Sequence, residues 1–456
     1  MFSAPSSRLH KFLTGNPARV ITVSFLFVIL MGTALLVLPI SSRGGTATPF
    51  DEALFTATSA TCVTGLIVHD TYLYWSPFGQ AVILALIQVG GLGLVTFATF
   101  FNLALGRKMG LRGMDVAKES MNTDSFADVR ALVRTIFGIT FGVEALGALF
   151  LALAFIPRYG FLQGAAKGIF VSVSAFCNAG FDLMGSEGAY SSLMSFADSP
   201  LVLLTVSALV VTGGLGFVVW RDVARWRRTR HLELHTKVVL VMSAILLLGG
   251  AAAFLAAEWN NPATLGGMPF FQKLLGGFFQ SVTVRTAGFN AIDQAAMTDL
   301  SKIFSIALMF IGAAPAGTGG GIKVTTVAVI VMTVACVMRG ENDTIIFGRR
   351  VEHKAVYKAL ALFLLALCLV VLSAMVIHFA LDQQADAIDI VYEEVSAFAT
   401  VGLSAGITGQ LSGASRLVLI LSMFLGRVGP ISLAVSLSMG GPGRREVIPV
   451  GKILIG

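Results

Sequence analysis

Four short phrases that end in glycine recur along the chain at a nearly constant interval. Successive glycines lie 115, 108 and 114 residues apart: Gly65, Gly180, Gly288 and Gly402. An aromatic residue stands ten positions before each of them: Phe55, Phe170, Phe278 and Tyr392. Glycine adopts positive φ without a Cβ penalty, so consecutive carbonyls in such a turn can face the same way. Four turns that met around one axis could replace the water shell of a monovalent cation with backbone carbonyls.

The residues that end these phrases are therefore candidate ion ligands. They are Cys62, Val63, Thr64 and Gly65; Asn178, Ala179 and Gly180; Thr286, Ala287 and Gly288; and Thr400, Val401 and Gly402. The alternative is that each glycine only caps a helix, since glycine is common after a helix C-terminus. Four phrases in register favour the ion site. The four cysteines have no CxxC spacing, so we expect no metal other than a cation such as potassium, bound through backbone carbonyls.

The composition shows what kind of protein must position these turns. Of the 456 residues, 55% are hydrophobic and only 12% are charged, which is about half the charged share of a soluble domain. This excludes a soluble enzyme, a disordered chain and a disulfide-stapled secreted module. Eight apolar segments are near or above the ~20 residues that cross a bilayer. They are residues 20–40, 78–105, 135–156, 201–220, 238–257, 303–338, 359–381 and 417–439.

A shorter apolar run lies between the two spans of each pair, at residues 53–60, 165–176, 270–282 and 388–398. These runs are too short to cross and indicate re-entrant helices. The sequence thus predicts an all-α integral membrane protein with eight transmembrane helices. Four repeats of span, short helix, glycine turn and span would surround one pore with pseudo-fourfold symmetry. The predicted repeats are 16–110, 127–222, 235–340 and 354–442, followed by a short cytoplasmic tail, 443–456.

The charges predict the orientation of these spans. With the N-terminus inside, the inner segments hold most of the 32 Lys and Arg residues, as the positive-inside rule requires. We therefore expect a multi-pass protein of the cytoplasmic membrane with both termini in the cytoplasm. Acids of the last outer segment, among them Asp389, Glu393 and Glu394, would either attract cations to an outer mouth or form solvated surface.

Several features inside the spans break the pattern of plain membrane helices. Residues 312–321 hold five glycines and Pro315, which breaks a helix, so this stretch is expected below the glycine turns. Lys323 and Arg427 are intramembrane cations and therefore functional candidates, although a helix–helix bond or snorkelling would also explain them. Arg285 is expected to brace its turn from behind. Glu144, the one acid deep in a span, is interpreted as a pairing residue.

Two further patterns are given structural interpretations. Residues 90–93 and 213–216 both read Gly-Gly-Leu-Gly, but they lie inside predicted spans, where close helix packing explains them better than a dinucleotide loop. Residues 225–230 form a basic cluster beside a span. It indicates contact with membrane lipid, or the topology signal alone, and not nucleic acid.

The four glycine phrases resemble the filters of the Trk/Ktr/HKT superfamily of potassium and sodium transporters, and the resemblance covers essentially the whole chain. It is closest to the Ktr ion-conducting subunits, the KtrB group, because repeat one is not preceded by two extra spans. The resemblance implies that the glycine-rich stretch is an intramembrane gate. The implied gate residues are Gly312, Gly317, Thr318, Gly319, Gly320, Gly321, Lys323 and Arg427.

The resemblance also implies a homodimer, with one pore per chain, on a cytosolic ring of nucleotide-binding KtrA-type subunits. No cofactor is expected in this chain: potassium would occupy the filter, sodium would be either an activator or a co-ion, and nucleotide would bind only to the partner. In the family, a serine in the first filter goes with sodium selectivity. Gly65 occupies that place here, which favours potassium.

The predicted function is potassium uptake through a gated selectivity filter, and not an enzymatic activity. The main alternative is a cation-coupled secondary transporter, a Na⁺/K⁺ symporter, since internal repeats and broken helices also occur there. Those proteins usually have inverted repeats and midplane acids, whereas these repeats share one orientation and midplane acids are nearly absent. An intramembrane enzyme is a third alternative, without a visible nucleophile–base or metal set.

Overall fold

The structure is a computed structural model and describes residues 17–93, 96, 99, 126–381 and 385–429. Its helices are α2 (Pro17–Val37), α3 (Phe50–Thr61), α4 (Thr71–Tyr74), α5 (Pro77–Leu92), α8 (Phe126–Tyr159), α9 (Phe161–Phe176), α10 (Pro200–Gly214), α11 (Phe217–Thr229), α12 (Leu234–Glu258), α13 (Phe270–Thr283), α14 (Asp299–Phe310), α15 (Val324–Met338), α16 (His353–Ala380), α17 (Ala387–Phe398) and α18 (Gly413–Val428). Strands β1 (Ile345–Ile346) and β2 (Arg349–Arg350) form a small antiparallel hairpin. Single 3-10 turns lie at Pro39–Ser41, Gly185–Glu187, Met194–Phe196 and Thr408–Gln410. The described part is therefore largely helical, as the composition predicts.

Four described helices are long and apolar enough to cross a membrane: Arg19–Val37, Val133–Tyr159, Leu234–Glu258 and His353–Ala380. They correspond to the first span of each predicted pair. The second spans are different. The predicted span 201–220 is not one helix, because α10 and α11 are bent by 93° at a short break. The segments 78–105, 303–338 and 417–439 contain shorter helices, and the ends of the first and last of these segments lie outside the described residues.

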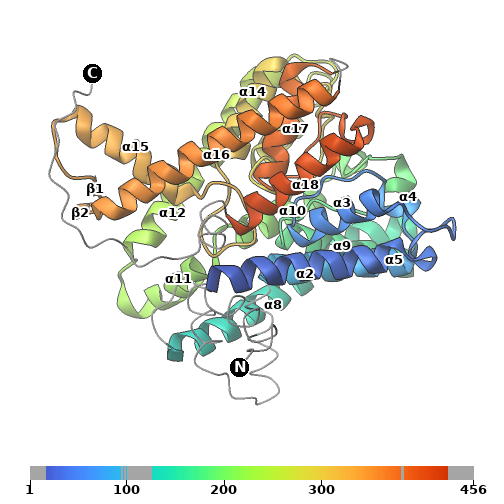
Figure 1. Cartoon of the computed structure of the whole chain (residues 1–456), viewed down its shortest axis with the longest axis horizontal. Helices are drawn as coiled ribbons and strands as arrows, with labels where there is room; N and C mark the ends of the chain where they lie inside the picture. Colours follow the sequence, from blue (N-terminus) through green and yellow to red (C-terminus); the bar gives the residue numbers. More distant parts are fainter. Residues whose placement is uncertain (1–16, 94–95, 97–98, 100–125, 382–384, 430–456) are drawn as a thin grey trace, which may run out of the picture.

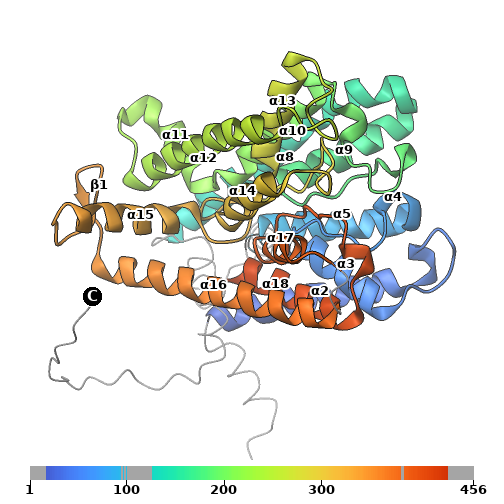
Figure 2. The ribbon, with the colours of Figure 1, turned by 90° about the horizontal axis from the view of Figure 1, so that it is seen from above.

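The short helices α3, α9, α13 and α17 form where the sequence predicts them, within a few residues. Three of them begin directly after a residue that cannot easily extend a helix backwards: Pro49, Gly160 and Pro269. Each short helix packs against the long helix before it, and also against a second-span helix of another repeat. The latter pairs are α5 with α9, α10 with α13, α14 with α17, and α18 with α3. The last pair closes the cycle, because α18 of the fourth repeat lies beside α3 of the first (Figures 1 and 2).

Three of the four second spans, those of α5, α10 and α18, share a Gly-x-x-Gly pattern at the level where the short helices end. The first glycine of each pattern lies against a short-helix carbonyl: Gly90 against Thr61, Gly213 against Phe176, and Gly426 against Phe398. A Cβ at any of these glycines would overlap that carbonyl oxygen. The second glycine has positive φ, +79° at Gly93, +88° at Gly216 and +91° at Gly429, and the regular helix stops before it. The breaks therefore come from close packing together with a left-handed residue.

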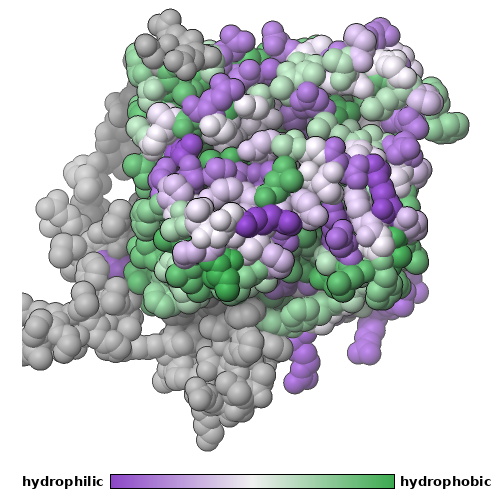
Figure 3. All heavy atoms as spheres, turned by 90° about the vertical axis from the view of Figure 1, so that its right-hand side faces the viewer, coloured by the Kyte–Doolittle hydropathy of each residue, from purple (hydrophilic) through white to green (hydrophobic). Residues whose placement is uncertain are grey.

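The surface shows how the molecule meets its surroundings. Large apolar side chains are exposed along the long helices, for example Phe27 on α2, Leu248 on α12 and Leu372 on α16. Figure 3 shows the right-hand end of Figure 1, where hydrophilic residues spread over the face and hydrophobic residues gather toward its edges. An apolar wall with a polar end is the distribution expected of a protein that sits in a bilayer.

We predict that Gly426→Ala destabilises the protein. The added Cβ would overlap the Phe398 carbonyl at the end of α17, and such overpacking typically costs about 1–3 kcal/mol. The matched control is Gly249→Ala on α12, where a Cβ would meet nothing within 4 Å. Thermal unfolding in detergent should give a lower midpoint for Gly426→Ala alone, and equal midpoints would contradict this packing.

Candidate ion-coordination site

The four glycine turns have the same backbone conformation. In each turn the glycine and the residue two positions before it are both left-handed. The glycine φ values are +99° at Gly65, +69° at Gly180, +77° at Gly288 and +90° at Gly402. The other φ values are +52° at Val63, +59° at Asn178, +65° at Thr286 and +53° at Thr400. A β-branched residue with positive φ is a genuine outlier, and three of these residues are β-branched. Such strain persists only where the surroundings hold it, and it clusters at functional sites.

Hydrogen bonds from the short helices hold these turns. In three turns the residue before the glycine donates its amide to the carbonyl five residues earlier. These bonds are Thr64 N to Ser59 O at 2.8 Å, Ala179 N to Ser174 O at 2.7 Å, and Val401 N to Ser396 O at 2.8 Å. The hydroxyls of Ser59 and Ser396 also accept from the glycine amides, at 3.1 Å each. The third turn differs, because Val282 stands where the other turns have serine, and the hydroxyl of the next residue, Thr283, accepts from the Phe289 amide at 2.9 Å.

The four turns meet in a closed ring. A Cβ on each glycine would approach the carbonyl oxygen of the next turn around the ring, in the same position each time. These pairs are Gly65 with Ala179, Gly180 with Ala287, Gly288 with Val401, and Gly402 with Thr64. The turns thus bring four carbonyl-bearing segments into mutual contact, and glycine is the one residue that fits at each contact. All the predicted ligand residues except Cys62 lie in these turns, and Cys62 is the buried residue that caps α3.

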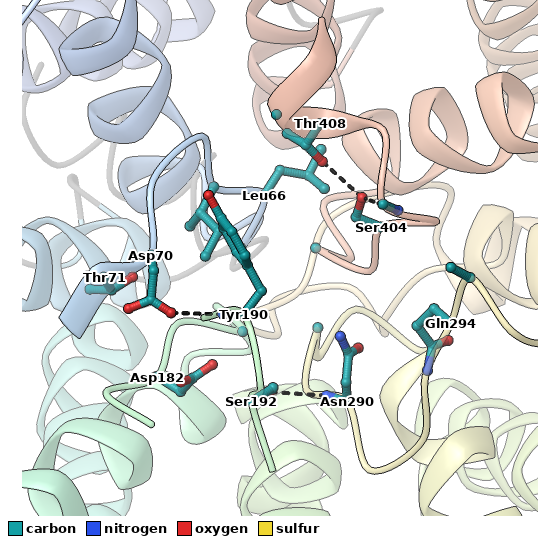
Figure 4. Close-up of a pocket in the computed structure, with 18 of the residues that line it drawn as sticks. Leu66, Asp70, Thr71, Asp182, Tyr190, Ser192, Asn290, Gln294, Ser404 and Thr408 are labelled. Carbon is teal, nitrogen blue, oxygen red and sulfur yellow. Dashed lines mark hydrogen bonds between the residues drawn. The ribbon is translucent and has the colours of Figure 1, made fainter. Parts of the chain in front are cut away.

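A cavity of about 260 Å³ opens on one side of the ring, and all four glycines line it. Figure 4 shows the polar groups around it, among them Asp70, Asp182 and Tyr190. Asp70 is held in place, since its carboxylate accepts from the amides of Leu73 and Tyr190 at 2.9 Å. Burial raises the pKa of Asp182 to about 6. A third carboxylate, Asp293, lies on the same lining. The cavity is therefore a vestibule that favours cations.

The acids expected at an outer mouth are elsewhere. Glu393 and Glu394 are completely buried in α17, so they are neither vestibule nor solvated surface. Glu394 accepts from the Ser422 hydroxyl at 2.6 Å, and Asp389 pairs with Lys302 at 2.6 Å. The expectation was wrong for Glu393 and Glu394, because the charges of an amphipathic short helix look like those of a loop in the sequence. The acids that do line the vestibule lie in the loops that follow the glycine turns.

The glycine-rich segment 311–323 lies on the other side of the ring. Its ends are tied together by the bond from Gly312 N to Ile322 O at 2.8 Å. The hydroxyl of Thr318 contacts Phe176 O at 3.1 Å and Asn178 Oδ1 at 3.2 Å. Gly320 N donates to Thr400 Oγ1 at 3.0 Å. A Cβ on Gly319 would overlap Thr286 Oγ1. The segment therefore touches three of the four turns directly.

The predicted intramembrane cations both contact this segment. Arg427 donates to the carbonyls of Thr318 and Gly90, and to Gly91 O at 3.4 Å. Its guanidinium thus joins the segment to the end of α5. Lys323 Nζ donates to Gly319 O at 2.7 Å, within the segment. Arg285 donates to Gly312 O at 3.5 Å, so it also contacts the segment. The expected pairing of Glu144 is with Gln88, at 3.1 Å.

The sequence did not predict what holds this segment in place. Three backbone hydrogen bonds join it to the break between α10 and α11. They are Ala314 N to Gly214 O at 3.0 Å, Thr318 N to Gly213 O at 3.2 Å, and Phe217 N to Ala316 O at 3.0 Å. The Gly-Gly-Leu-Gly pattern at residues 213–216 was interpreted as helix packing alone. The signal that could have revealed more is the recurrence of Gly-x-x-Gly in the same place in three second spans.

The comparison with known families decides the class of this protein. The family model of the cation transport protein TrkH matches residues 8–443. The chain belongs to the TrkH family of cation transport proteins. It is a membrane transporter and not an enzyme.

Individual relatives match the sequence of this chain over nearly their whole length. The chain is 39% identical to the Ktr system potassium uptake protein B of Bacillus subtilis, covering 94% of each chain. It is 38% identical to a protein of the same name from Vibrio alginolyticus, over 97% of this chain and 95% of the relative. It is also 38% identical to the potassium/sodium uptake protein NtpJ of Enterococcus hirae, over 92% and 93%.

A solved structure supports the fold. The potassium transporter TrkH of Vibrio parahaemolyticus superposes with a TM-score of 0.67, at 18% identity, over 91% of this chain and 84% of that one. At this identity the likeness concerns the fold alone.

We predict that Gly402→Ser impairs ion discrimination. The side chain would be forced into a left-handed turn and against the Thr64 carbonyl. We expect the K⁺/Na⁺ permeability ratio to fall about tenfold, which corresponds to ~1.4 kcal/mol. The control is Gly409→Ser, which lines the same vestibule where a Cβ would meet nothing within 4 Å. Reversal potentials under bi-ionic conditions measure the ratio, and an unchanged ratio in Gly402→Ser would exclude Gly402 from the selective site.

Proposed function

We propose that this chain takes up potassium across the cytoplasmic membrane through a selectivity filter made of the four glycine turns. The observation that carries the proposal is the closed ring, in which each glycine faces the carbonyl of the next turn. Carbonyl oxygens in such a ring replace the hydration shell of K⁺. The potassium uptake named for relatives at 38–39% identity supports the choice of ion.

The architecture belongs to the same proposal. Eight spans and four short helices surround one pore with pseudo-fourfold symmetry, in repeats 16–110, 127–222, 235–340 and 354–442, with the tail 443–456 and both termini in the cytoplasm. The cyclic packing of α5, α10, α14 and α18 on the short helices supports this arrangement. The ends of repeats one and four, and the tail, lie outside the described residues.

The glycine-rich segment is the gate in this proposal. It lies under the ring, bonded to Asn178 and Thr400, and Arg427 holds its Thr318 carbonyl. Potassium that leaves the filter on this side meets the segment, so conduction requires that these bonds break. In this proposal the chain forms a homodimer on a ring of KtrA-type subunits that carry the nucleotide, and a change in that ring would break these bonds. Sodium would act as an activator.

Cation flux into liposomes tests the proposed function. We expect ⁸⁶Rb⁺ uptake by the purified chain that K⁺ competes strongly and Na⁺ competes weakly, with choline as the inert control. Equal uptake of ²²Na⁺ and ⁸⁶Rb⁺ would refute a potassium-selective filter. Uptake of Rb⁺ that depends strictly on co-transported Na⁺ would instead support the alternative, a Na⁺/K⁺ symporter.

We predict that Thr318→Ala raises flux in the absence of any partner. The change removes the hydroxyl that contacts Phe176 O and Asn178, and each such bond contributes about 0.5–1.5 kcal/mol to the seated gate. Thr318→Ser keeps the hydroxyl and is the matched control. Removal of residues 317–320 should raise flux further. If ⁸⁶Rb⁺ uptake by correctly folded Thr318→Ala and by the deletion stays at the level of the unmodified chain, the segment is not a gate.

A further inference from the structure

Helix α11 combines a charged outer face with a direct attachment to the glycine-rich segment. It follows the 93° bend after α10, so it turns away from the direction of the span. Figures 1 and 2 show it beside α12, in the same half of the molecule as α15 and the β1–β2 hairpin. A helix that turns this sharply after an apolar helix does not continue its crossing.

The outer face of this helix is strongly basic. Four arginines in or directly after α11 are exposed: Arg225, Arg227, Arg228 and Arg230. The indole of Trp226 is 43% exposed, and the Arg230 guanidinium lies 5.5 Å from its ring centre. The single acid of α11, Asp222, is buried and accepts from the Glu233 amide at 2.9 Å. No negative charge on this helix therefore neutralises the arginines.

The inner face of the same helix is joined to the proposed gate. Phe217 and Val219 are buried, and Val219 belongs to a small core with Val239, Ala314 and Val324. Phe217 N donates to Ala316 O at 3.0 Å, and the residues just before α11 accept from Ala314 and Thr318. Displacement of α11 therefore pulls on the segment that lies under the ring.

We propose that the arginine face of α11 binds anionic phospholipid headgroups of the inner leaflet, and that this contact keeps the gate segment seated. The inference rests on the proposed gate and adds its regulation. Arginine guanidinium binds phosphate with two parallel hydrogen bonds, and tryptophan favours the headgroup level of a membrane. A basic amphipathic helix beside a span is a recognised site for anionic lipid. We choose lipid over a protein partner because α11 directly follows an apolar helix and presents an exposed tryptophan among its arginines.

The experiment uses the full chain in vesicles of phosphatidylcholine alone or mixed with phosphatidylglycerol. The test variant is Arg227→Gln/Arg228→Gln. The matched control is Arg349→Gln/Arg350→Gln, which removes two exposed arginines from the β1–β2 hairpin. Binding is measured as quenching of tryptophan fluorescence by brominated lipid, and Trp226→Phe identifies the share of the signal that comes from Trp226. Gating is measured as basal ⁸⁶Rb⁺ uptake.

We expect brominated phosphatidylglycerol to quench Trp226 more than brominated phosphatidylcholine, and this preference to disappear in Arg227→Gln/Arg228→Gln. In vesicles with phosphatidylglycerol, that variant should show basal uptake about fivefold higher, since each arginine near an anionic surface contributes measurably to binding. The hairpin control should match the unmodified chain in both readouts.

Two results would overturn the inference. Equal quenching by both lipids would mean that the face does not select anionic headgroups, and loss of activation by a cytosolic subunit in the test variant would then assign the face to a protein. A lipid preference with unchanged basal uptake would refute the link to the gate. Failure of the proposed function is distinguishable, because no variant, including the deletion of 317–320, would then take up Rb⁺ while Trp226 still reported lipid.

Discussion

The structure depends on the absence of a side chain at four positions. Each ring glycine lies where any Cβ would strike a carbonyl of the next turn, and each is left-handed. These two constraints fix both the residue type and the distance between the turns. The strain of three left-handed β-branched residues beside the glycines is sustained because the short helices that precede them are buried and hydrogen-bonded to the turns. A geometry held so rigidly is suited to replacing a hydration shell with fixed carbonyl dipoles.

The same close packing explains the broken second spans. Gly90, Gly213 and Gly426 let helices cross directly over the carbonyl ends of the short helices, and a left-handed glycine three residues later stops each regular helix. The free carbonyls at these breaks are then used. Gly90 and Gly91 accept from Arg427, while Gly213 and Gly214 accept from the glycine-rich segment. The same glycine contacts thus support the ring and leave free the backbone carbonyls to which the proposed gate segment and Arg427 bind.

Much of this could be predicted from the sequence because the four units repeat. The short helices, the glycine turns and the break near Pro315 follow from local signals of composition and spacing, whereas a place for Arg427 at the glycine-rich segment was implied by the family resemblance. Hydropathy continues unbroken through 201–220, so the only local sign of the bend at Leu215 is the recurring Gly-x-x-Gly pattern, and the use of the bend is visible only in the tertiary hydrogen bonds. Backbone propensity also predicts against a left-handed conformation at the β-branched residues Val63, Thr286 and Thr400. The vestibule acids were missed because Glu393 and Glu394 carry the more obvious charge pattern, yet they are buried among hydroxyls.

The central claim is that a dehydrated cation binds inside the ring. It is tested most directly by a structure determined in Rb⁺ or Tl⁺, with anomalous scattering to locate the ion. The account predicts anomalous density on the axis between the carbonyls of Thr64, Ala179, Ala287 and Val401, and loss of that density when Na⁺ replaces the heavier ion. Density confined to the vestibule near Asp70 and Asp182, with none within the ring, would contradict it.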